Sequence, residues 1–383
     1  MRLGFGRKML CGLGMAIVCL LSCPWASGQA KPAQKAPMAE DVFKNVQVLK
    51  GVPVDQFMDT MGFFAASLSL NCTDCHTVDS GGDWAKYADD TDLKRMARQM
   101  VLMVTAINNN NFGGTRKVTC YTCHRGARLP KVNPSLIVQY GVPAPDDPNE
   151  VIVPSRPAAG APAADQVFDK YIQALGGAAQ LANVTSFTGK GTYNGYDTEM
   201  EDRPVEIFAK APGLRASIVH MRGADSTRTY DGSDAWIASP DKPVPILAVT
   251  GGDLDSARLD AIIAFPAFIK QAYPQWWMGS TQIDDKDVIV LQGIAPDRTP
   301  AKLYFDKQSG LLVRKLLFAN TIVGLVPTQV DYSDYRPVAG IKMPFTWITT
   351  WTDGQSTTKL TDVQPNVPID ATKFAKPTPV SGP

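Results

Sequence analysis

Hydrophobic residues recur at helical spacing in two segments of the N-terminal third of the chain. Between Val54 and Leu68 they return every three or four residues, and a longer stripe of the same kind runs from Asp92 to Asn108. This spacing places apolar side chains on one face of a helix. Asn108 to Asn111 and the pair Gly113-Gly114 are typical of a helix end. We therefore predict two amphipathic helices.

The C-terminal half shows the shorter period of a β-sheet. Ala301, Leu303 and Phe305 alternate with polar neighbours before "DKQSG" at 306–310, which predicts a hairpin, and similar segments follow one another after about residue 185. One helix is expected before them, from Asp165 to Leu175, with Asp165 as its N-cap. We predict an antiparallel sheet with a lead helix.

Proline content separates the two halves. Residues 129–164 contain eight prolines and no sustained period, as in a semi-extended linker. The predicted fold class is α+β, with a mainly helical N-terminal domain at 31–128, this Pro/Ala-rich linker, and an antiparallel β domain at 165–383. A chain of 383 residues is long enough for about two domains.

Residues 1–30 have the layout of a secretory signal. Basic residues precede an apolar run of 13 residues, Met9 to Leu21, and small residues lead to a cleavage site at Ala30. The alternative is lipoprotein processing at "LLSC", with cleavage between residues 22 and 23 and acylation of Cys23, which would anchor the protein to a membrane. We expect an exported, periplasmic protein, membrane-attached in the lipoprotein case.

Removing this signal leaves 35 basic and 37 acidic residues in the mature chain. This balance lacks the positive charge that nucleic-acid binding requires. No nucleophile triad or phosphate loop is evident in the C-terminal half, so we predict no catalytic residue and do not expect an enzyme.

The candidate chemistry lies in two short cysteine motifs. The chain has seven cysteines, and those outside the signal form the pairs of "CTDCH" at 72–76 and "CYTCH" at 120–124. Two thiols at this spacing can add to the two vinyl groups of a porphyrin, and the adjacent histidine then faces the iron. The motifs predict two covalently bound haem c groups, with these attachment residues and proximal ligands: Cys72, Cys75, His76, Cys120, Cys123 and His124.

Three rival uses of the cysteines remain to be compared. A four-cysteine zinc site would not need a histidine after each pair, and the gap between Cys75 and Cys120 is long for a compact zinc knuckle. A redox dithiol normally involves one pair, and structural disulfides would not explain His76 and His124. Haem attachment is the prediction that uses all six residues.

Each iron of an electron carrier needs a sixth ligand. Only one histidine, His220, lies outside the two motifs, in a strand-like segment. Methionine is the alternative, because a thioether raises the reduction potential. Each motif follows a helix that carries a pair of methionines, "MDTM" at 58–61 and "MVLM" at 100–103. Most of these methionines are expected to be packing residues, with one iron ligand on each helix.

"LSLNCTDCH" and "RQMVLMVTAINNNNFGG...VTCYTCHRG" resemble the tetrahaem cytochrome subunit of photosynthetic reaction centres, over roughly residues 40–128. The resemblance implies Met61 as the sixth ligand of the first haem and Met100 as that of the second, with Met58 and Met103 as the next candidates. Only two of that family's four haem units are present. A general periplasmic electron carrier is therefore expected, rather than a subunit docked on a photochemical centre.

The C-terminal half resembles another family. A helix ending in "ALGG", then "VTSFTGKGTY", "TYDGSDAW" and "LYFDKQSGLLVRKL", are similar to the half-barrel superfamily of outer-membrane lipoprotein-sorting proteins. That resemblance implies a curved sheet around an apolar cavity.

Two main functions are consistent with these features. The first is single-electron transfer to and from redox protein partners through two His/Met-ligated haems, with the β domain docking a partner. The second is a lipid- or quinone-binding carrier whose haems serve the ligand. A weaker third hypothesis is a dihaem peroxidase, which requires an iron without bound methionine.

Overall fold

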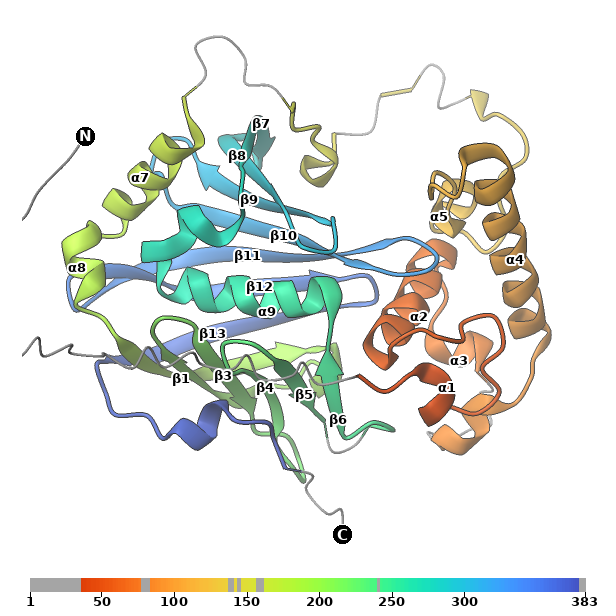
Figure 1. The fold of residues 1–383 in the computed structure, drawn as a ribbon, viewed down its shortest axis with the longest axis horizontal. Coiled ribbons are helices and arrows are strands. Elements are labelled where there is room, and N and C mark those ends of the chain that lie inside the picture. The colour runs from red at the N-terminus through yellow and green to blue at the C-terminus, as the bar shows by residue number, and fades with distance from the viewer. Residues whose placement is uncertain are drawn as a thin grey trace, which may run out of the picture. The chain divides into compact units, whose positions relative to one another are not determined.

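The structure is a computed structural model, and it describes residues 36–76, 83–136, 141–142, 146–155, 162–239 and 242–378. The predicted signal segment, including Cys23, lies outside these residues. Residues 34–383 form one compact unit. Figure 1 shows helices in the N-terminal part and a large sheet in the C-terminal part, so the predicted α+β class is confirmed.

The N-terminal part is built from short and long helices. They are α1 (Ala39–Val42), α2 (Val54–Leu68), α3 (Cys72–Cys75), η2 (Trp84–Ala88), α4 (Asp92–Phe112) and α5 (Cys120–His124). Helix α2 has the bounds that the hydrophobic spacing predicts. Helix α4 continues through the asparagine run to Phe112, and Gly113 then ends it in the left-handed region, at φ 58°.

The sheet has 13 strands in the order β6-β5-β4-β3-β2-β1-β13-β12-β11-β10-β9-β8-β7, and every pairing is antiparallel. The strands are β1 (Ser186–Gly195), β2 (Arg203–Lys210), β3 (Leu214–Val219), β4 (Ser226–Tyr230), β5 (Ala235–Ala238), β6 (Ile246–Val249), β7 (Trp277–Ile283), β8 (Lys286–Ile294), β9 (Pro300–Asp306), β10 (Leu312–Asn320), β11 (Leu325–Val338), β12 (Ile341–Trp351) and β13 (Gly354–Pro365). The first and last strands are neighbours, so two meanders join into one open sheet. The predicted β9–β10 hairpin is present.

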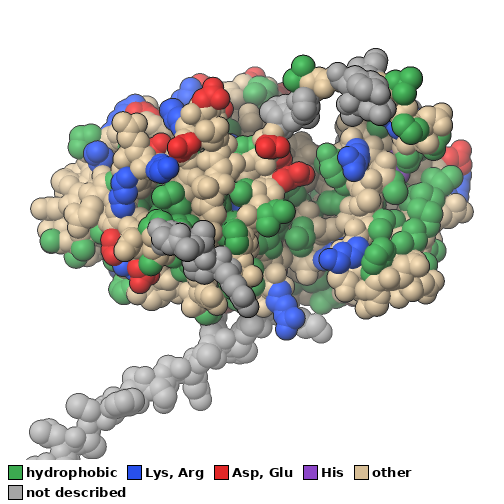
Figure 2. Space-filling model, turned by 90° about the horizontal axis from the view of Figure 1, so that it is seen from above, with side chains coloured by type: hydrophobic (Ala, Val, Ile, Leu, Met, Phe, Trp, Pro, Cys, Tyr) green, Lys and Arg blue, Asp and Glu red, His purple; other side chains and the backbone are tan. Residues whose placement is uncertain are grey.

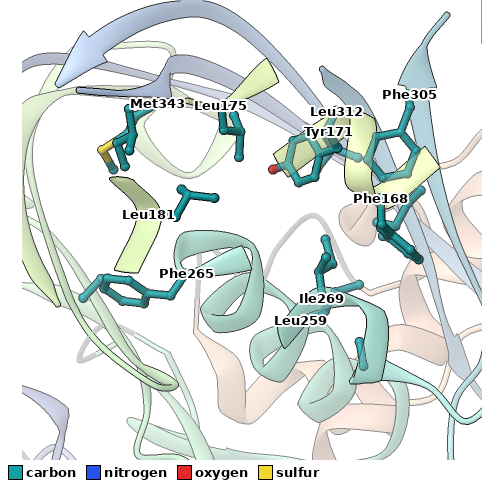
Figure 3. Close-up of a cluster of buried hydrophobic side chains, with 14 of the residues drawn as sticks. Phe168, Tyr171, Leu175, Leu181, Leu259, Phe265, Ile269, Phe305, Leu312 and Met343 are labelled. Atoms are coloured by element: carbon teal, nitrogen blue, oxygen red, sulfur yellow. The ribbon is translucent and has the colours of Figure 1, made fainter. Parts of the chain in front are cut away.

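Helices lie inside the curve of this sheet (Figure 1). They are α7 (Ala164–Ala174), α8 (Ala178–Ala182), α9 (Gly251–Ala264) and the turn η5 (Pro266–Ala272). Figure 3 shows the core between them and the strands, where Phe168 and Tyr171 of α7 pack against Phe305 of β9. Leu259 of α9 and Ile269 of η5 are fully buried in the same cluster. The apolar faces of the helices therefore fill the concave side of the sheet.

Two details differ from the sequence prediction. The lead helix begins after Ala163, so Asp165 lies in its first turn and is not its N-cap. Helix α9 and η5 were not predicted, because α9 is enclosed by the sheet and its buried residues include Asp255 as well as Leu259. A helix buried on several sides lacks a single apolar stripe. Helix α9 and the turn η5 after it connect the edge strands β6 and β7 across the concave face.

Part of the proline-rich segment lies along the sheet. Its turn η3 (Pro148–Glu150) contacts β7. The Lys302 ammonium donates to the carbonyl oxygens of Asn149 and Val151, at 2.8 and 2.9 Å. The hydroxyl of Tyr304 donates to the Pro148 carbonyl at 3.1 Å. Apolar and polar residues alternate along β9, so Lys302 was expected to be exposed. These bonds explain why it is only 7% exposed.

Candidate haem-attachment site

The first cysteine pair occupies a single helical turn. Helix α3 begins after Asn71, whose side-chain oxygen accepts a hydrogen bond from the Asp74 amide at 3.1 Å. The Asp74 carboxylate accepts in return from the Asn71 amide at 2.8 Å. This reciprocal capping satisfies two amides that a helix start leaves free. Cys72 and Cys75 are thereby held one turn apart at either end of α3.

The second pair is held in a similar way. The Thr119 amide donates to the Thr122 hydroxyl at 3.0 Å, at the start of α5. After the motif, the Gly126 amide donates to the Ser67 carbonyl at the end of α2, at 3.0 Å. The helix that precedes the first motif therefore packs against the second motif. Helix α2 and the second motif therefore form one local structure.

Both motif histidines have the same hydrogen-bonding arrangement. Nδ1 of His76 is 2.9 Å from the Tyr87 carbonyl oxygen, and Nδ1 of His124 is 3.0 Å from the Ala127 carbonyl oxygen. A carbonyl only accepts hydrogen bonds, so Nδ1 of each ring carries the proton. Nε2 of a neutral ring is then free to bind a metal, as in other histidine metal sites. The same chemistry at both motifs argues for the same role.

Burial favours the neutral form of the first histidine. It lowers the pKa of His76, and the nearby Lys94 ammonium lowers this pKa further, against the opposing effect of the Tyr87 carbonyl. The Tyr87 ring also stacks on the imidazole, with ring centroids 4.5 Å apart. The side chain is therefore fixed in orientation as well as in tautomer.

Residues of both motifs line a single cavity of about 240 Å³, but Cys72 is not among them. Its wall is mainly apolar and includes Cys75, His76, Cys120, Cys123, His124, Met61, Met96, Met100, Met103, Phe57, Phe64, Tyr87 and Leu93. Met61 and Met100 both lie on it. Met58 is 43% exposed and is not part of this wall, whereas Met103 is. A mainly apolar wall that carries both motif histidines and several thioethers offers the side chains that haem ligation uses.

Several apolar side chains near this cavity are exposed. On α4 they include Met96 and Met103, at 52% and 44%, together with Leu102 and Phe112. In Figure 2, hydrophobic side chains gather at the right-hand side of the molecule, which is the side where α4 lies in Figure 1. Met96 and Met103 belong to the cavity wall, so a flat apolar group in the cavity would cover them.

The thiols do not have the properties of the rival sites. The four described cysteines form no disulfide with one another. Burial raises the pKa of Cys72, Cys75 and Cys120, whereas a redox dithiol depends on a thiol with a lowered pKa. Nowhere in the described ranges do three or more histidine, cysteine or acidic side chains cluster as a metal site requires. The remaining histidine, His220, lies beside Asp225 in the sheet part, 2.8 Å from its carboxylate.

Contacts with the sheet support the helices that carry the methionines. Phe63 of α2, Cys120 of α5 and Val323 and Val326 of the β10–β11 hairpin share one buried cluster. At the other end of α2, Asp55 accepts hydrogen bonds from the Thr250 amide and hydroxyl, at 2.5 and 2.6 Å, where α9 begins. The sheet part therefore forms part of the support of the cysteine motifs.

Two residues near the motifs were not predicted from the sequence. Tyr87 provides the acceptor for His76, and Lys94 donates to the same carbonyl oxygen. Both come from the segment between the motifs, where η2 and the start of α4 return to α3. Neither belongs to a motif, and no spacing rule connects them to His76.

The sheet part contains a second, smaller cavity of about 110 Å³. It lies between α7, α8, α9 and the strands, and its apolar wall includes Leu175, Phe187 and Trp347. Three charged residues also line it: Arg215, Asp260 and Lys342. Ligand pockets are usually larger, at roughly 300–1,000 Å³.

The region of the two motifs is also the part of the chain that is similar to known cytochromes. Residues 23–139 match the family described as photosynthetic reaction centre cytochrome C subunit. The chain is 39% identical over 99 residues to the photosynthetic reaction center cytochrome c subunit of Thermochromatium tepidum, a match that covers 25% of this chain and 23% of the relative. The corresponding subunit of Roseobacter denitrificans is 35% identical over 101 residues, 24% of this chain and 26% of the relative.

The chain thus spans about a quarter of the length of these curated relatives. The predicted resemblance is confirmed for the region of the cysteine motifs.

Solved structures similar to this chain align with about half of it. A LolA superfamily protein from Nitrosomonas europaea aligns with 56% of this chain and 99% of its own, at 15% identity and a TM-score of 0.38. An outer membrane lipoprotein-sorting protein domain from Vibrio parahaemolyticus aligns with 50% of this chain and 90% of its own, at 11% identity and a TM-score of 0.35.

Among the helices of the described residues, none has the length and apolar character needed to cross a membrane.

Proposed function

We propose that the protein is an exported dihaem c-type cytochrome that transfers single electrons between redox protein partners. Cys72, Cys75 and His76 would hold the first haem, and Cys120, Cys123 and His124 the second. The observation that carries this proposal is the repeated arrangement of the two histidines, each with Nδ1 bonded to a carbonyl, on one methionine-lined cavity.

Each haem, when bound, supplies a one-electron couple. The chain's residues would attach it, orient it and set its environment. Nε2 of His76 and of His124 would bind the two irons, because Nδ1 of each is already bonded. The apolar wall would exclude water from the ligands.

The thioethers of Met61 and Met100 are the proposed sixth ligands. Their position on the cavity wall supports them, as does the exposure of Met58 outside it. With a histidine and a methionine bound, neither iron would have an open position for a substrate, as suits a carrier and not a peroxidase.

Carbon monoxide tests this proposal directly. In the reduced protein, both irons should keep their methionine, and the visible spectrum should be unchanged after carbon monoxide is added. Prompt and complete binding would show an open iron position and would favour the peroxidase hypothesis.

The export and anchoring of the protein belong to the same proposal. Cleavage after Ala30 would release a periplasmic protein, whereas acylation at Cys23 would anchor it to a membrane surface. Mass spectrometry of the mature N-terminus distinguishes the two, because the first gives a peptide that begins at Lys31.

A second candidate function is binding of an apolar ligand in the sheet part. The apolar wall of its cavity supports this hypothesis, with Arg215 and Asp260 available for a polar end. A volume of about 110 Å³ suits a small group rather than a whole lipid. Extraction and mass analysis of the purified protein test it, and the absence of any co-purified apolar molecule would count against it.

A further inference from the structure

Charge is distributed very unevenly between the two cysteine-motif segments. Residues 36–92 contain ten acidic and three basic residues. Residues 93–145 contain eight basic residues and no acidic one. The near-neutral total of the chain hides this difference. Electrostatic steering depends on such local distributions rather than on net charge.

Five of these eight basic residues flank the second cysteine motif in sequence. Four of the five are exposed, namely Lys117 before α5 and Arg125, Arg128 and Lys131 after it. Within the described residues, none of these four side chains forms an ion pair or a hydrogen bond. Their charge is therefore available to a partner. Arg116 is half-buried instead and donates to Asn320.

The segment between Lys117 and Lys131 also exposes part of the haem-attachment sequence. Cys123 is exposed, and the ring of Tyr121 is 52% exposed. A partner that docks on Lys117 and Arg125 would therefore lie next to the group that Cys123 attaches. Electron transfer needs a short distance between the two redox centres, and docking at this position would provide it.

The first segment exposes acidic side chains, although Lys94 and Arg98 of α4 also lie beside it. Asp74 lies inside the first cysteine motif and is exposed, as are Asp83 and Asp89. An acidic partner would be repelled there and attracted to the second segment. Like charges in the wrong orientation are a common source of specificity in docking.

We propose that the surface around α5, formed by Lys117, Arg125, Arg128 and Lys131, docks a redox protein with an acidic surface, so that electrons pass through the second haem. This inference rests on the proposed function. The partner class follows from charge complementarity and from the exposed attachment residue. In the exchange, one electron moves between the partner and the haem iron, which changes between Fe(II) and Fe(III).

The test uses the reduced full-length mature protein and two inorganic oxidants of opposite charge. Ferricyanide is an anion, and tris(phenanthroline)cobalt(III) is a cation; each takes one electron from an Fe(II) haem. Stopped-flow rates are recorded from low to high ionic strength. We expect the ferricyanide rate to fall as salt rises, because salt screens the attraction.

Charge reversal identifies the surface. Lys117→Glu should slow the ferricyanide reaction at low salt by roughly threefold to tenfold, within the range of electrostatic steering, and this effect should vanish at high salt. Lys50→Glu is the matched control, since Lys50 is also an exposed lysine but precedes the first motif. It should change that rate by less than twofold. Equal effects of the two reversals would overturn the proposal.

An additional measurement separates a protein partner from a membrane. Co-sedimentation of the protein with anionic phosphatidylglycerol vesicles is compared with co-sedimentation with phosphatidylcholine vesicles. If the surface docks a protein, Lys117→Glu should leave any binding to the anionic vesicles unchanged. Binding that this variant abolishes would assign the surface to an anionic membrane instead. If the proposed function itself is wrong, neither oxidant gives a haem absorbance change. If only this inference is wrong, both oxidants react and Lys117→Glu leaves their rates unchanged.

Discussion

The ammonium of Lys94 and the imidazole of His76 donate hydrogen bonds to the same backbone oxygen, that of Tyr87. Nδ1 of His76 is 2.9 Å from it and Nζ of Lys94 is 2.5 Å from it. A carbonyl oxygen has two lone pairs and can accept both bonds. His124 has the corresponding bond to Ala127, but no lysine shares that acceptor among the described residues. The two histidines therefore differ in their electrostatic surroundings.

This relationship predicts that Lys94→Gln lowers the reduction potential of the first haem. Loss of the positive charge stabilises Fe(III) relative to Fe(II). In addition, His76 becomes the stronger donor to Tyr87, which makes its ring a more basic ligand. Both effects have the same sign. We expect roughly a tenfold change in the oxidised-to-reduced ratio at fixed potential, about 59 mV for a one-electron couple.

Spectroelectrochemical titration of the two haems measures this shift. Lys94→Arg keeps the charge and should retain most of the potential. The second haem should be nearly unaffected in both variants. An unchanged or raised potential of the first haem in Lys94→Gln would contradict the role of the shared carbonyl.

The proposed iron ligands predict distinct spectra for the methionine variants. Met61→Ala should remove the sulfur–iron absorbance band of one haem and allow carbon monoxide to bind there, and Met100→Ala should do the same at the other. Met58→Ala is the control for the first helix, because Met58 lies outside the cavity wall. Met103→Ala is the corresponding variant on α4. If Met58→Ala instead removes the band, the ligand lies one turn earlier on α2.

The cluster around Phe63 predicts a loss of stability. Phe63→Ala should lower the free energy of unfolding by about 3–5 kcal/mol, the usual cost of truncating a buried phenylalanine. Its ring packs with Val323, Val326 and Cys120, so this change also loosens the support of the second motif. Phe112, which is 42% exposed, provides a matched control. Urea unfolding of Phe112→Ala should change stability by less than about 0.5 kcal/mol.

A buried carboxyl on α2 predicts a pH dependence. Burial, and then the neighbouring Asp253 carboxylate, raises the pKa of Asp59 to about 9 from an ordinary value of 3.8. Between these pH values the folded protein keeps a proton that the unfolded chain has released. The contribution of Asp59 to the free energy of unfolding therefore falls as pH rises through this window.

Asp59→Asn removes that dependence. The variant should gain stability relative to the wild type between about pH 5 and pH 9. Thermal unfolding across this range measures the difference. Asp41→Asn, at an exposed position of α1, is the matched control for replacing an aspartate by asparagine at the surface. If the difference in stability between Asp59→Asn and the wild type did not change with pH, a raised pKa of Asp59 would be ruled out.

Local patterns predicted the elements that carry the chemistry. The apolar stripe of α2 and the glycine stop of α4 depend on neighbours within one or two turns, so both helices could be placed from the sequence. The cysteine and histidine spacing predicted the attachment motifs for the same reason. The β9–β10 hairpin followed from alternation and a turn.

Features that depend on distant residues were not predictable in this way. Helix α9 is buried against several strands, which removes the one-sided pattern that marks a surface helix. The bonds from Lys302 to Asn149 and Val151 join residues about 150 positions apart in sequence. Lys94 and His76 meet only because the chain between the motifs folds back. Such contacts come from the tertiary structure and leave no period in the sequence.

A coulometric redox titration of the full-length mature protein tests the central claim most directly. Two haems of the proposed kind predict an uptake of two electrons per chain, each in a one-electron step that follows the haem absorbance. Uptake of one electron or none, or a single two-electron step without a haem signal, as a dithiol would give, would contradict the account.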